Sequence, residues 1–487
     1  MCLLRYFDIM KKGSSYNHIF KYTALFGGVQ GLNILISLVR NKFIAIILGP
    51  IGVGLISIYN TALTLLQNST NFGLQMSGVR EISQAFDAQD FERTEYYISM
   101  LRSWCLIVAM LGFAVCLALS SPLSLWAFSS NEHTIHFALL SIVVAMTAIA
   151  GGETAILKAT RRLKQLAKTS VGGVLVALII SVPLYIKWSY GGIVPSLILI
   201  SFSQMVLVMW YSYRYYPIHL MTKWQSLKEG KAMITVGMAF VIAGVLGSGA
   251  EFIVRAYLGD MSVSLAGLYN AGYMITMTYA GMVFAAMETD YYPHLSAVCD
   301  DTKKMNGAAN KQIEVSLIII APMLVALMFS VNILIPLLFS GKFMPVVGMT
   351  QIAVIAMYFR AINLPVAYIM LAKGDSKSYL MLEAVYDILI VVCIIFGYTN
   401  WGLDGTGIAL ATASFVDTTC VLFYCSWKYD FEMSERLFKN FVLQLMIGLV
   451  ALAVVKLSGA IIYWSTGLML FGLSLYISLR MYKNIGQ

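Results

Sequence analysis

Polar and charged side chains interrupt this apolar sequence at spacings that place them on single helix faces. Between residues 30 and 40, 60 and 71, and 248 and 255 they recur about every three or four positions. A charge at the bilayer centre costs about 2.5–3.5 kcal/mol on insertion scales, so these faces favour a water-filled cavity. Guanidinium groups there suit an anionic substrate, because they pair with both oxygens of a phosphate or carboxylate. The predicted substrate-binding residues are Gln30, Asn33, Arg40, Lys42, Asn60, Arg255, Asn270 and Arg360.

Three carboxylates also fall inside apolar runs, namely Glu153, Glu251 and Asp417. Acidic side chains within a membrane commonly belong to ion or proton pathways, so we predict that these three take part in ion coupling. Simpler interpretations stay open at this stage. Glu251 and Arg255 are four residues apart and can pair with each other, and isolated amides can bond neighbouring helices. The basic residues near position 40 can also extend to the headgroup region.

The composition indicates the class of protein. Of the 487 residues 59% are hydrophobic and only 12% are charged, whereas soluble domains carry about 25% charged residues. This is typical of an integral membrane protein, in which a spanning helix needs about 20 mostly apolar residues. No G-x-x-x-x-G-K-[ST] sequence occurs, which argues against a phosphate-binding loop for ATP.

Metal, disulfide and cofactor chemistry have little support in the sequence. The seven cysteines form no C-x-x-C and lie mostly in apolar runs, which argues against a disulfide framework. His133 and His136 are three residues apart beside Glu132, but zinc takes three or four ligands. We therefore predict no metal and no cofactor. The formal charge of +9 does not indicate a nucleic-acid partner, because the basic residues follow the membrane topology described below.

Apolar runs predict fourteen membrane spans, and an internal repeat groups twelve of them into two lobes. An offset of 210 residues aligns identical residues over positions 48–60 and 258–270, which indicates a duplication. Six spans per copy enter the membrane in the same sense and commonly place a substrate site at their interface. The expected domains are residues 1–225, 226–430 and 431–487. The expected spans lie near 20–47, 51–73, 98–120, 136–157, 169–187, 191–213, 232–258, 263–287, 313–335, 349–371, 380–398, 404–427, 440–457 and 460–480.

The basic residues predict the orientation of these spans. Most of the 33 lysines and arginines fall in alternate connections if both ends of the chain are cytoplasmic. The densest group is the connection between the fourth and fifth spans, from Lys158 to Lys168. We therefore expect cytoplasmic N- and C-termini.

Four sequence stretches resemble the polysaccharide-exporter branch of the multidrug/oligosaccharidyl-lipid/polysaccharide (MOP) superfamily, specifically the Wzx-type O-antigen and enterobacterial-common-antigen flippases. They are L-V-R-N-K-F-I-A-I-I-L-G-P-I-G-V-G-L from Leu38, A-M-E-T-D-Y-Y-P-H-L from Ala286, N-K-Q-I-E from Asn310 and L-A-K-G-D-S-K-S from Leu371. The second is the most specific, and its family-motif residues are Asp290, Tyr291, Tyr292 and Pro293.

The resemblance implies an all-α membrane fold with two six-helix lobes around a cationic cavity and two further C-terminal helices. The implied cargo is an undecaprenyl-diphosphate-linked oligosaccharide, moved from the cytoplasmic to the periplasmic leaflet of the bacterial inner membrane for cell-surface polysaccharide synthesis. The lipid bilayer, a polysaccharide polymerase and a chain-length regulator are the implied partners. In related lipid II flippases arginines on the first helix are important, and Arg40 matches that position in kind.

Two other functions remain as alternatives. A drug or small-metabolite antiporter of the same superfamily would carry acidic rather than arginine-rich charge in its cavity. A membrane glycosyltransferase or polymerase would need a large outer loop with acid, base or metal-binding residues, whereas the predicted outer loops are short. We therefore predict a transporter and not an enzyme.

Overall fold

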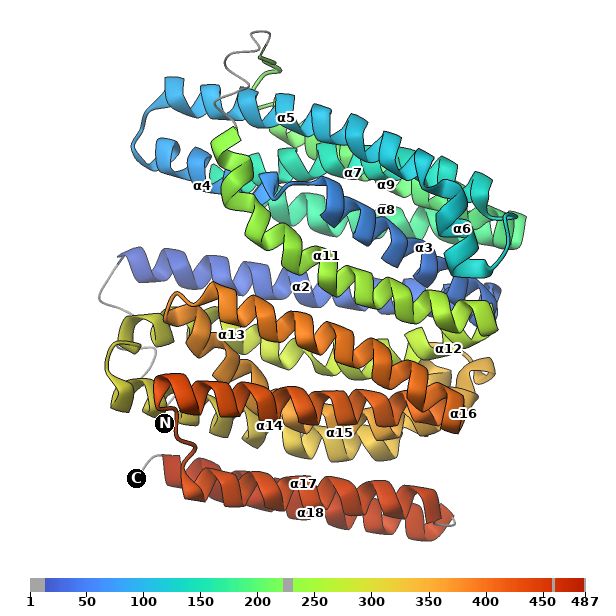
Figure 1. Ribbon diagram of the computed structural model, residues 1–487, viewed down its shortest axis with the longest axis vertical. Helices are drawn as coiled ribbons and strands as arrows, with labels where there is room; N and C mark the ends of the chain where they lie inside the picture. The colour runs from blue at the N-terminus through green and yellow to red at the C-terminus, as the bar shows by residue number, and fades with distance from the viewer. Residues whose placement is uncertain (1–13, 222–230, 458–459, 486–487) are drawn as a thin grey trace. The chain divides into compact units, whose positions relative to one another are not determined.

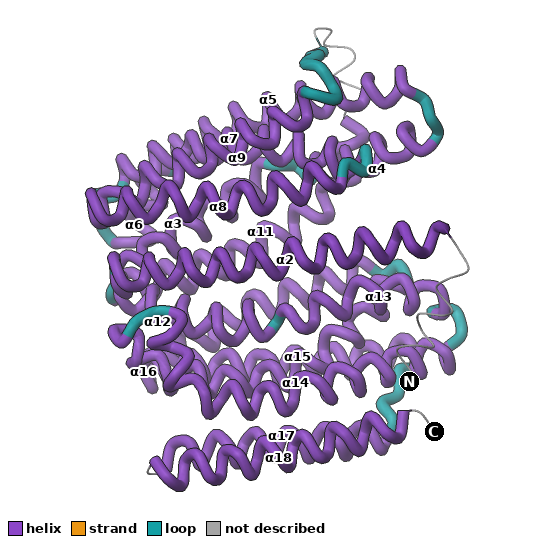
Figure 2. Tube along the Cα trace, turned by 180° about the vertical axis from the view of Figure 1, so that it is seen from behind, coloured by secondary structure: helices purple, strands orange, loops and turns teal. Residues whose placement is uncertain are grey.

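The computed structural model describes residues 14–221, 231–457 and 460–485, and it is helical without a strand over these ranges (Figures 1 and 2). Side chains are described for residues 28–221, 241–284, 291–456 and 461–483. The predicted all-α membrane fold is confirmed.

Two compact units divide the helices. The first unit runs to Leu48 and continues from Tyr59 to Val245; the second holds Gly49–Ile58 and everything from Leu246 onward. The elements of the first half are α2 (Ser14–Ile47), α3 (Gly49–Thr70), α4 (Leu74–Asp87), α5 (Phe91–Ala118), α6 (Ser120–Phe128), α7 (Thr134–Ala159), α8 (Leu163–Trp188), η2 (Ser189–Gly192) and α9 (Ile193–Tyr213). Those of the second half are α11 (Lys231–Met261), α12 (Val263–Tyr273), η3 (Met274–Ala280), α13 (Met282–Val298), α14 (Thr302–Leu338), η4 (Gly341–Val346), α15 (Val347–Ala372), α16 (Ser376–Tyr429), α17 (Glu435–Leu457) and α18 (Ala460–Ile485).

Eleven helical stretches in the described part of the chain are long and apolar enough to cross a membrane. Two of them, Leu163–Tyr213 and Ser376–Tyr429, each contain a pair of predicted spans joined by a tight turn. The predicted span near 263–287 consists of α12, η3 and α13, which are separately too short to count as spans. Every predicted span therefore coincides with helical residues apart from a few positions at helix ends and junctions, such as 71–73.

A sharp bend divides α16 into two spans. At about 1.5 Å per residue its 54 residues would measure roughly 80 Å, far more than a bilayer of about 30 Å. Gly402 adopts φ +59°, a left-handed conformation that glycine reaches without strain, and the helix reverses there. The two arms then touch at Gly397 and Gly405, where a Cβ on either residue would lie within 2.3 Å of the other's carbonyl oxygen.

Aspartates fix the starts of three long helices. The carboxylate of Asp90 accepts the backbone N–H of Arg93, that of Asp301 accepts those of Lys303 and Lys304, and Asp375 begins α16 in the same way. An N-cap of this type typically contributes about 1 kcal/mol.

The repeat-related segments 48–60 and 258–270 cross in direct backbone contact. A Cβ on Gly54 would lie 2.0 Å from the carbonyl oxygen of Val263, and one on Gly267 would lie 1.9 Å from that of Pro50. Glycine at both positions is what permits this approach. The following helix is a π-helix, η3, a geometry frequently found at functional sites.

The last two helices, α17 and α18, lie side by side in both views (Figures 1 and 2). The buried amide of Gln444 in α17 donates to the carbonyl of Ser474 and to Ser478 in α18, and accepts from the hydroxyl of Ser474. In α18, Gly467 allows the ring of Phe329 from α14 to approach, because a Cβ there would lie 2.7 Å from the ring.

Candidate functional site

The predicted polar face of the first span packs against α8 within the first unit. Asn33 of α2 donates to the hydroxyl of Ser170 at 2.6 Å, and the Nε of Arg40 donates to that of Ser181 at 3.2 Å. Asn33 also donates to Gln30, one turn earlier, at 3.5 Å. Arg40 is half-buried, and no ion pair includes it among the described residues. Part of the guanidinium is therefore available for a further anionic group.

The two remaining predicted binding residues of the first half are Lys42 and Asn60. Lys42 is half-buried on α2 and interacts with other groups of the protein. Asn60 is exposed on α3, where its backbone carbonyl accepts the hydroxyl of Thr64.

A second predicted group forms around Arg255 in the second unit. Its Nη1 lies 3.3 Å from a carboxylate oxygen of Glu251, one turn earlier on α11. Its Nε and Nη2 each lie 3.4 Å from the amide oxygen of Asn270 on α12, and Tyr273 stacks at 5.2 Å. The guanidinium is 6% exposed and the Glu251 side chain 48% exposed. The i, i+4 pairing left open from the sequence is thus present, and Arg255 is already neutralised.

Arg360 lies in a third group, a small polar cavity of about 70 Å³ between α15 and α16. Glu383 and Asp417 line the same cavity, and Asn363 donates to Asp417 at 2.7 Å. An Nη of Arg360 also reaches the sulfur of Met277, at 3.6 Å. One cation beside two carboxylates suits a proton or a small cation better than a large anion.

Glu383 and Asp387 are polar residues that the sequence analysis missed. Both fall inside the predicted span 380–398, four residues apart on one face of α16. Asp387 is buried, and its Oδ2 has no hydrogen-bond partner among the residues that the structure describes. Two acidic residues at i, i+4 in an apolar run were the signal that could have found them.

Glu153 is held by a partner that is distant in the sequence. Arg102 of α5 contacts both carboxylate oxygens of Glu153 on α7, at 2.8 and 3.1 Å. The same guanidinium donates to the carbonyls of Tyr216 and Pro217, just beyond α9. With exposures of 5% and 2%, the two charges form a buried pair that joins three helices of the first unit.

The family-motif residues have a packing role wherever their side chains are described. Tyr291 is buried and donates to the carbonyl of Pro365 at 2.7 Å, which ties α13 to α15. The Tyr292 ring lies 5.6 Å from that of Tyr368, and Pro293 lies inside α13. The side chain of Asp290 lies outside the described residues.

The other two motifs of the second half meet at the connection between α16 and α17. Asn310 donates to the carbonyl of Glu432 and accepts the N–H of Ser434, at 2.8 and 2.9 Å. Asp375 accepts hydrogen bonds from Lys428 and Tyr429 at the end of α16. These bonds hold the pKa of the Asp375 carboxyl well below its usual range.

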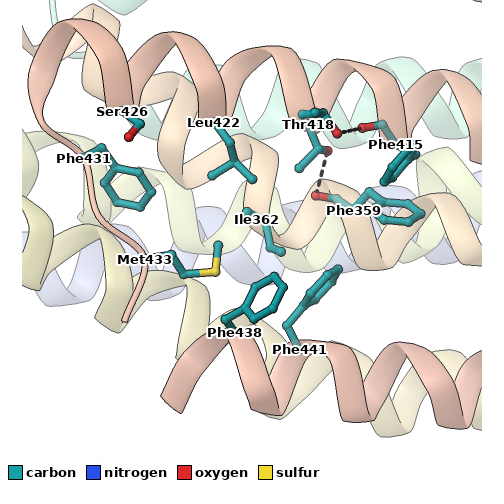
Figure 3. A pocket seen from close by; sticks show the side chains of 11 residues that line it. Phe359, Ile362, Phe415, Thr418, Leu422, Ser426, Phe431, Met433, Phe438 and Phe441 are labelled. Carbon is teal, nitrogen blue, oxygen red and sulfur yellow. Dashed lines mark hydrogen bonds between the residues drawn. The ribbon is translucent and has the colours of Figure 1, made fainter. Parts of the chain in front are cut away.

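This connection borders an apolar pocket of about 340 Å³ (Figure 3). The phenylalanines come from α15, α16, the connection and α17. The hydroxyls of Thr418 and Thr419 donate to backbone carbonyls, so the walls present mainly carbon. The lining residues are Phe359, Ile362, Phe415, Thr418, Thr419, Leu422, Ser426, Phe431, Met433, Phe438 and Phe441.

The arrangement of helices matches solved transporters of one superfamily. An inward-facing multidrug resistance MATE family transporter of the MOP superfamily superimposes with a TM-score of 0.68 at 13% identity, over 88% of this chain and 96% of that one. The lipid II flippase MurJ, in an inward closed conformation, gives a TM-score of 0.67 at 14% identity, over 95% and 100%. The fold is that of MOP-superfamily membrane transporters.

Residues 43–348 match the family model described as polysaccharide biosynthesis protein. Because the match covers more than half of the chain, the chain belongs to this family. A curated relative, the lipopolysaccharide biosynthesis protein WzxC of Escherichia coli (strain K12), is 22% identical over 158 residues. That alignment spans 32% of each chain, or about a third of the length of the relative. The resemblance to the polysaccharide-exporter branch is confirmed.

Proposed function

We propose that this protein is a flippase that moves an undecaprenyl-diphosphate-linked oligosaccharide from the cytoplasmic to the periplasmic leaflet, for cell-surface polysaccharide synthesis. The family match over residues 43–348, on a MOP-type fold, is the observation that carries the proposal. A diphosphate with attached sugars cannot cross hydrocarbon unaided, so it needs a wet path with hydrogen-bonding groups. Alternating access by two repeat-related lobes would provide that path.

Within this proposal Arg40 is the first candidate for binding the diphosphate. Its side chain bonds a neutral serine, and a planar guanidinium binds phosphate oxygens in pairs. Gln30, Asn33, Lys42 and Asn60 would contribute polar contacts to the same cargo. Their shared origin, in α2 and α3, supports this assignment.

Arg255 and Arg360 are proposed to bind the cargo less readily than Arg40, because each already lies beside carboxylates of the protein. Arg255 would release Glu251 or Asn270 before it could bind a diphosphate in full. The carboxylates Glu251 and Asp417 are proposed to couple transport to an ion or proton gradient, because acidic groups inside a membrane are costly, rare and commonly part of ion or proton pathways. Glu153 is the weakest coupling candidate, since Arg102 occupies both of its oxygens.

The apolar pocket is proposed to accept part of the isoprenoid tail. Its phenylalanines and methionine offer about 340 Å³ of hydrocarbon-compatible space (Figure 3). Because lipid tails are as apolar as these side chains, the pocket would hold part of the tail without a penalty relative to the bilayer. The tail could therefore remain in an apolar environment while the headgroup moves.

The proposed location is the inner membrane, with both termini cytoplasmic. The concentration of basic residues in alternate connections supports this orientation. A polysaccharide polymerase and a chain-length regulator are the proposed protein partners, because they would consume the flipped product.

Arginine replacements test the binding proposal in proteoliposomes loaded with the lipid-linked oligosaccharide. A hydrogen bond to a charged group contributes about 1.5–3 kcal/mol, so Arg40→Ala should weaken cargo binding by roughly ten- to a hundredfold. Arg40→Lys keeps the charge without the planar fork and should impair transport less. Arg161→Ala is the control, since this exposed arginine pairs with Asp87. Normal transport by correctly inserted Arg40→Ala would refute its role.

The paired variant Glu251→Gln, Arg255→Gln separates binding from local neutralisation. The measurement is cargo binding and not transport, because Glu251 is itself a proposed coupling residue. If Arg255 only neutralises Glu251, removing both charges should leave cargo binding intact. If Arg255 holds the cargo, the double variant should lose binding as Arg255→Ala does.

A drug antiporter of the same superfamily is the second candidate. The acidic residues Glu383, Asp387 and Asp417 favour it, because carboxylates attract cationic solutes. The fold match to a MATE family transporter agrees with this alternative but shows the fold alone.

A further inference from the structure

Three polar atoms lie close together at the N-terminal end of α7, in the first unit. The hydroxyl of Tyr59, on α3, lies 2.7 Å from the Nδ1 of His133 and 3.0 Å from that of His136. The two Nδ1 atoms lie 3.1 Å apart. Tyr59 is only 2% exposed, and both histidines are half-buried.

Hydrogen bonds satisfy these three contacts poorly. Two neutral imidazoles with one Nδ1–H between them, plus one phenol, offer two hydrogens for three edges of a nearly equilateral triangle. One hydrogen must then be shared between two edges as a three-centre bond, and both of its branches are bent well away from linear. Two Nδ1–H groups would instead point at each other. Hydrogen bonds therefore hold the three atoms together only with poor geometry.

A cation seated on the face of the triangle would satisfy every atom at once. Ligands about 2.0 Å from a tetrahedral metal centre lie about 3.3 Å apart, somewhat farther than the observed 2.7, 3.0 and 3.1 Å, so binding requires only a small spreading of the three side chains. Imidazole nitrogens suit zinc, copper, nickel and cobalt. In the sequence the two histidines have no third ligand beside them, whereas in the structure Tyr59 of α3 lies within reach of both.

The surroundings of the two histidines favour this geometry. The Phe128 ring stacks on His133 with 3.9 Å between centroids and fixes its orientation. The neighbouring carboxylate of Glu132 adds negative charge beside the His133 ring. Among the described residues, no three His, Cys, Asp or Glu side chains gather closely enough to hold a metal ion. The third ligand beside the two histidines would therefore be the phenol oxygen of Tyr59.

We propose that Tyr59, His133 and His136 bind one divalent transition-metal cation of the zinc type, with a fourth position left for water. Such a cation would join α3 to the start of α7 and would act independently of the proposed cargo. The proposal departs from the expectation of a metal-free protein.

Cobalt titration of the full-length protein tests this site. Protein purified without a polyhistidine tag and treated with chelator receives Co²⁺ alone, because tetrahedral Co²⁺ absorbs visible light far more strongly than the six-coordinate aqueous ion. We expect the absorption to saturate at one equivalent and to be displaced by Zn²⁺. The variant His133→Ala, His136→Ala should lose it, whereas the control His294→Ala, at an exposed histidine, should retain it.

Tyr59→Phe keeps the aromatic contacts to Phe128 and Phe137 and removes one oxygen, so it provides a variant expected to fold. It should weaken Co²⁺ binding by at least about tenfold. Absence of the visible band in the wild type, or an unchanged band in the double-histidine variant, would overturn the proposal. A band unchanged in Tyr59→Phe would overturn the role of Tyr59.

Discussion

Replacement of Glu153 by glutamine should destabilise the first unit strongly. The substitution keeps the size of the side chain but leaves the Arg102 guanidinium, 5% exposed, without its counter-charge. Breaking a buried pair by removing one partner costs about 3–5 kcal/mol, because the remaining charge is uncompensated. The hydrogen bonds from Arg102 to the carbonyls of Tyr216 and Pro217 remain in the variant. They partly compensate the guanidinium charge and can reduce the cost to the lower end of this range.

The expected change in melting temperature follows from the size of the unit. For domains of 150–250 residues, 1 kcal/mol shifts the melting temperature by about 2–4 °C, so Glu153→Gln should lower it by roughly 6–20 °C. A thiol-reactive fluorophore can follow unfolding in detergent, because Cys105 and Cys116 are buried in this unit.

The surface pair of Arg161 and Asp87 provides a matched control. Its N–O distance is 2.7 Å, close to that of the buried pair, but the side chains are 67% and 49% exposed. Exposed pairs contribute about 0–1 kcal/mol, so Asp87→Asn should shift the melting temperature by at most about 4 °C. Equal shifts in the two variants would refute the reasoning that burial makes the Glu153 pair essential.

Three further predictions concern the second unit. Gly267→Ala should prevent normal folding or insertion, because its Cβ would lie 1.9 Å from the carbonyl oxygen of Pro50; full yield and an unchanged melting temperature would contradict this contact. Tyr291→Phe should cost about 0.5–1.5 kcal/mol by removing one hydrogen bond to α15, measured by the same thermal assay, and a stabilised variant would contradict it. Hydrogen bonds from Lys428 and Tyr429 lower the folded-state pKa of Asp375, so its stabilisation is present above the unfolded value of about 3.9 and is lost as pH falls below it. Asp375→Asn should therefore make the melting temperature less dependent on pH between about 5 and 3, and an unchanged slope would contradict this.

Local spacing predicted the elements and some of the contacts. The polar face of the first span was readable because residues three and seven positions apart share a helix face, and Asn33 and Arg40 indeed contact the same helix, α8. The pairing of Glu251 with Arg255 was readable for the same reason. The reversal at Gly402 lies in the predicted gap between spans 380–398 and 404–427.

Contacts between distant residues were not readable from one sequence. Arg102 and Glu153 are 51 positions apart, and no periodicity relates them. Tyr59 meets two histidines more than 70 positions away, so the third member of that cluster could not be named. The π-helix at Met274–Ala280 interrupts an apolar run whose composition is continuous, and hydropathy cannot detect such a change in hydrogen bonding.

The flux of cargo into proteoliposomes tests the central claim most directly. Vesicles containing the purified protein would receive either a labelled undecaprenyl-diphosphate-linked oligosaccharide or a cationic dye, with empty vesicles as the control. A membrane-impermeant glycosidase would then report how much glycan has crossed to the opposite leaflet. The flippase account predicts protein-dependent crossing of the lipid-linked oligosaccharide and none of the dye. Dye transport without any crossing of the oligosaccharide would contradict the account and favour the antiporter.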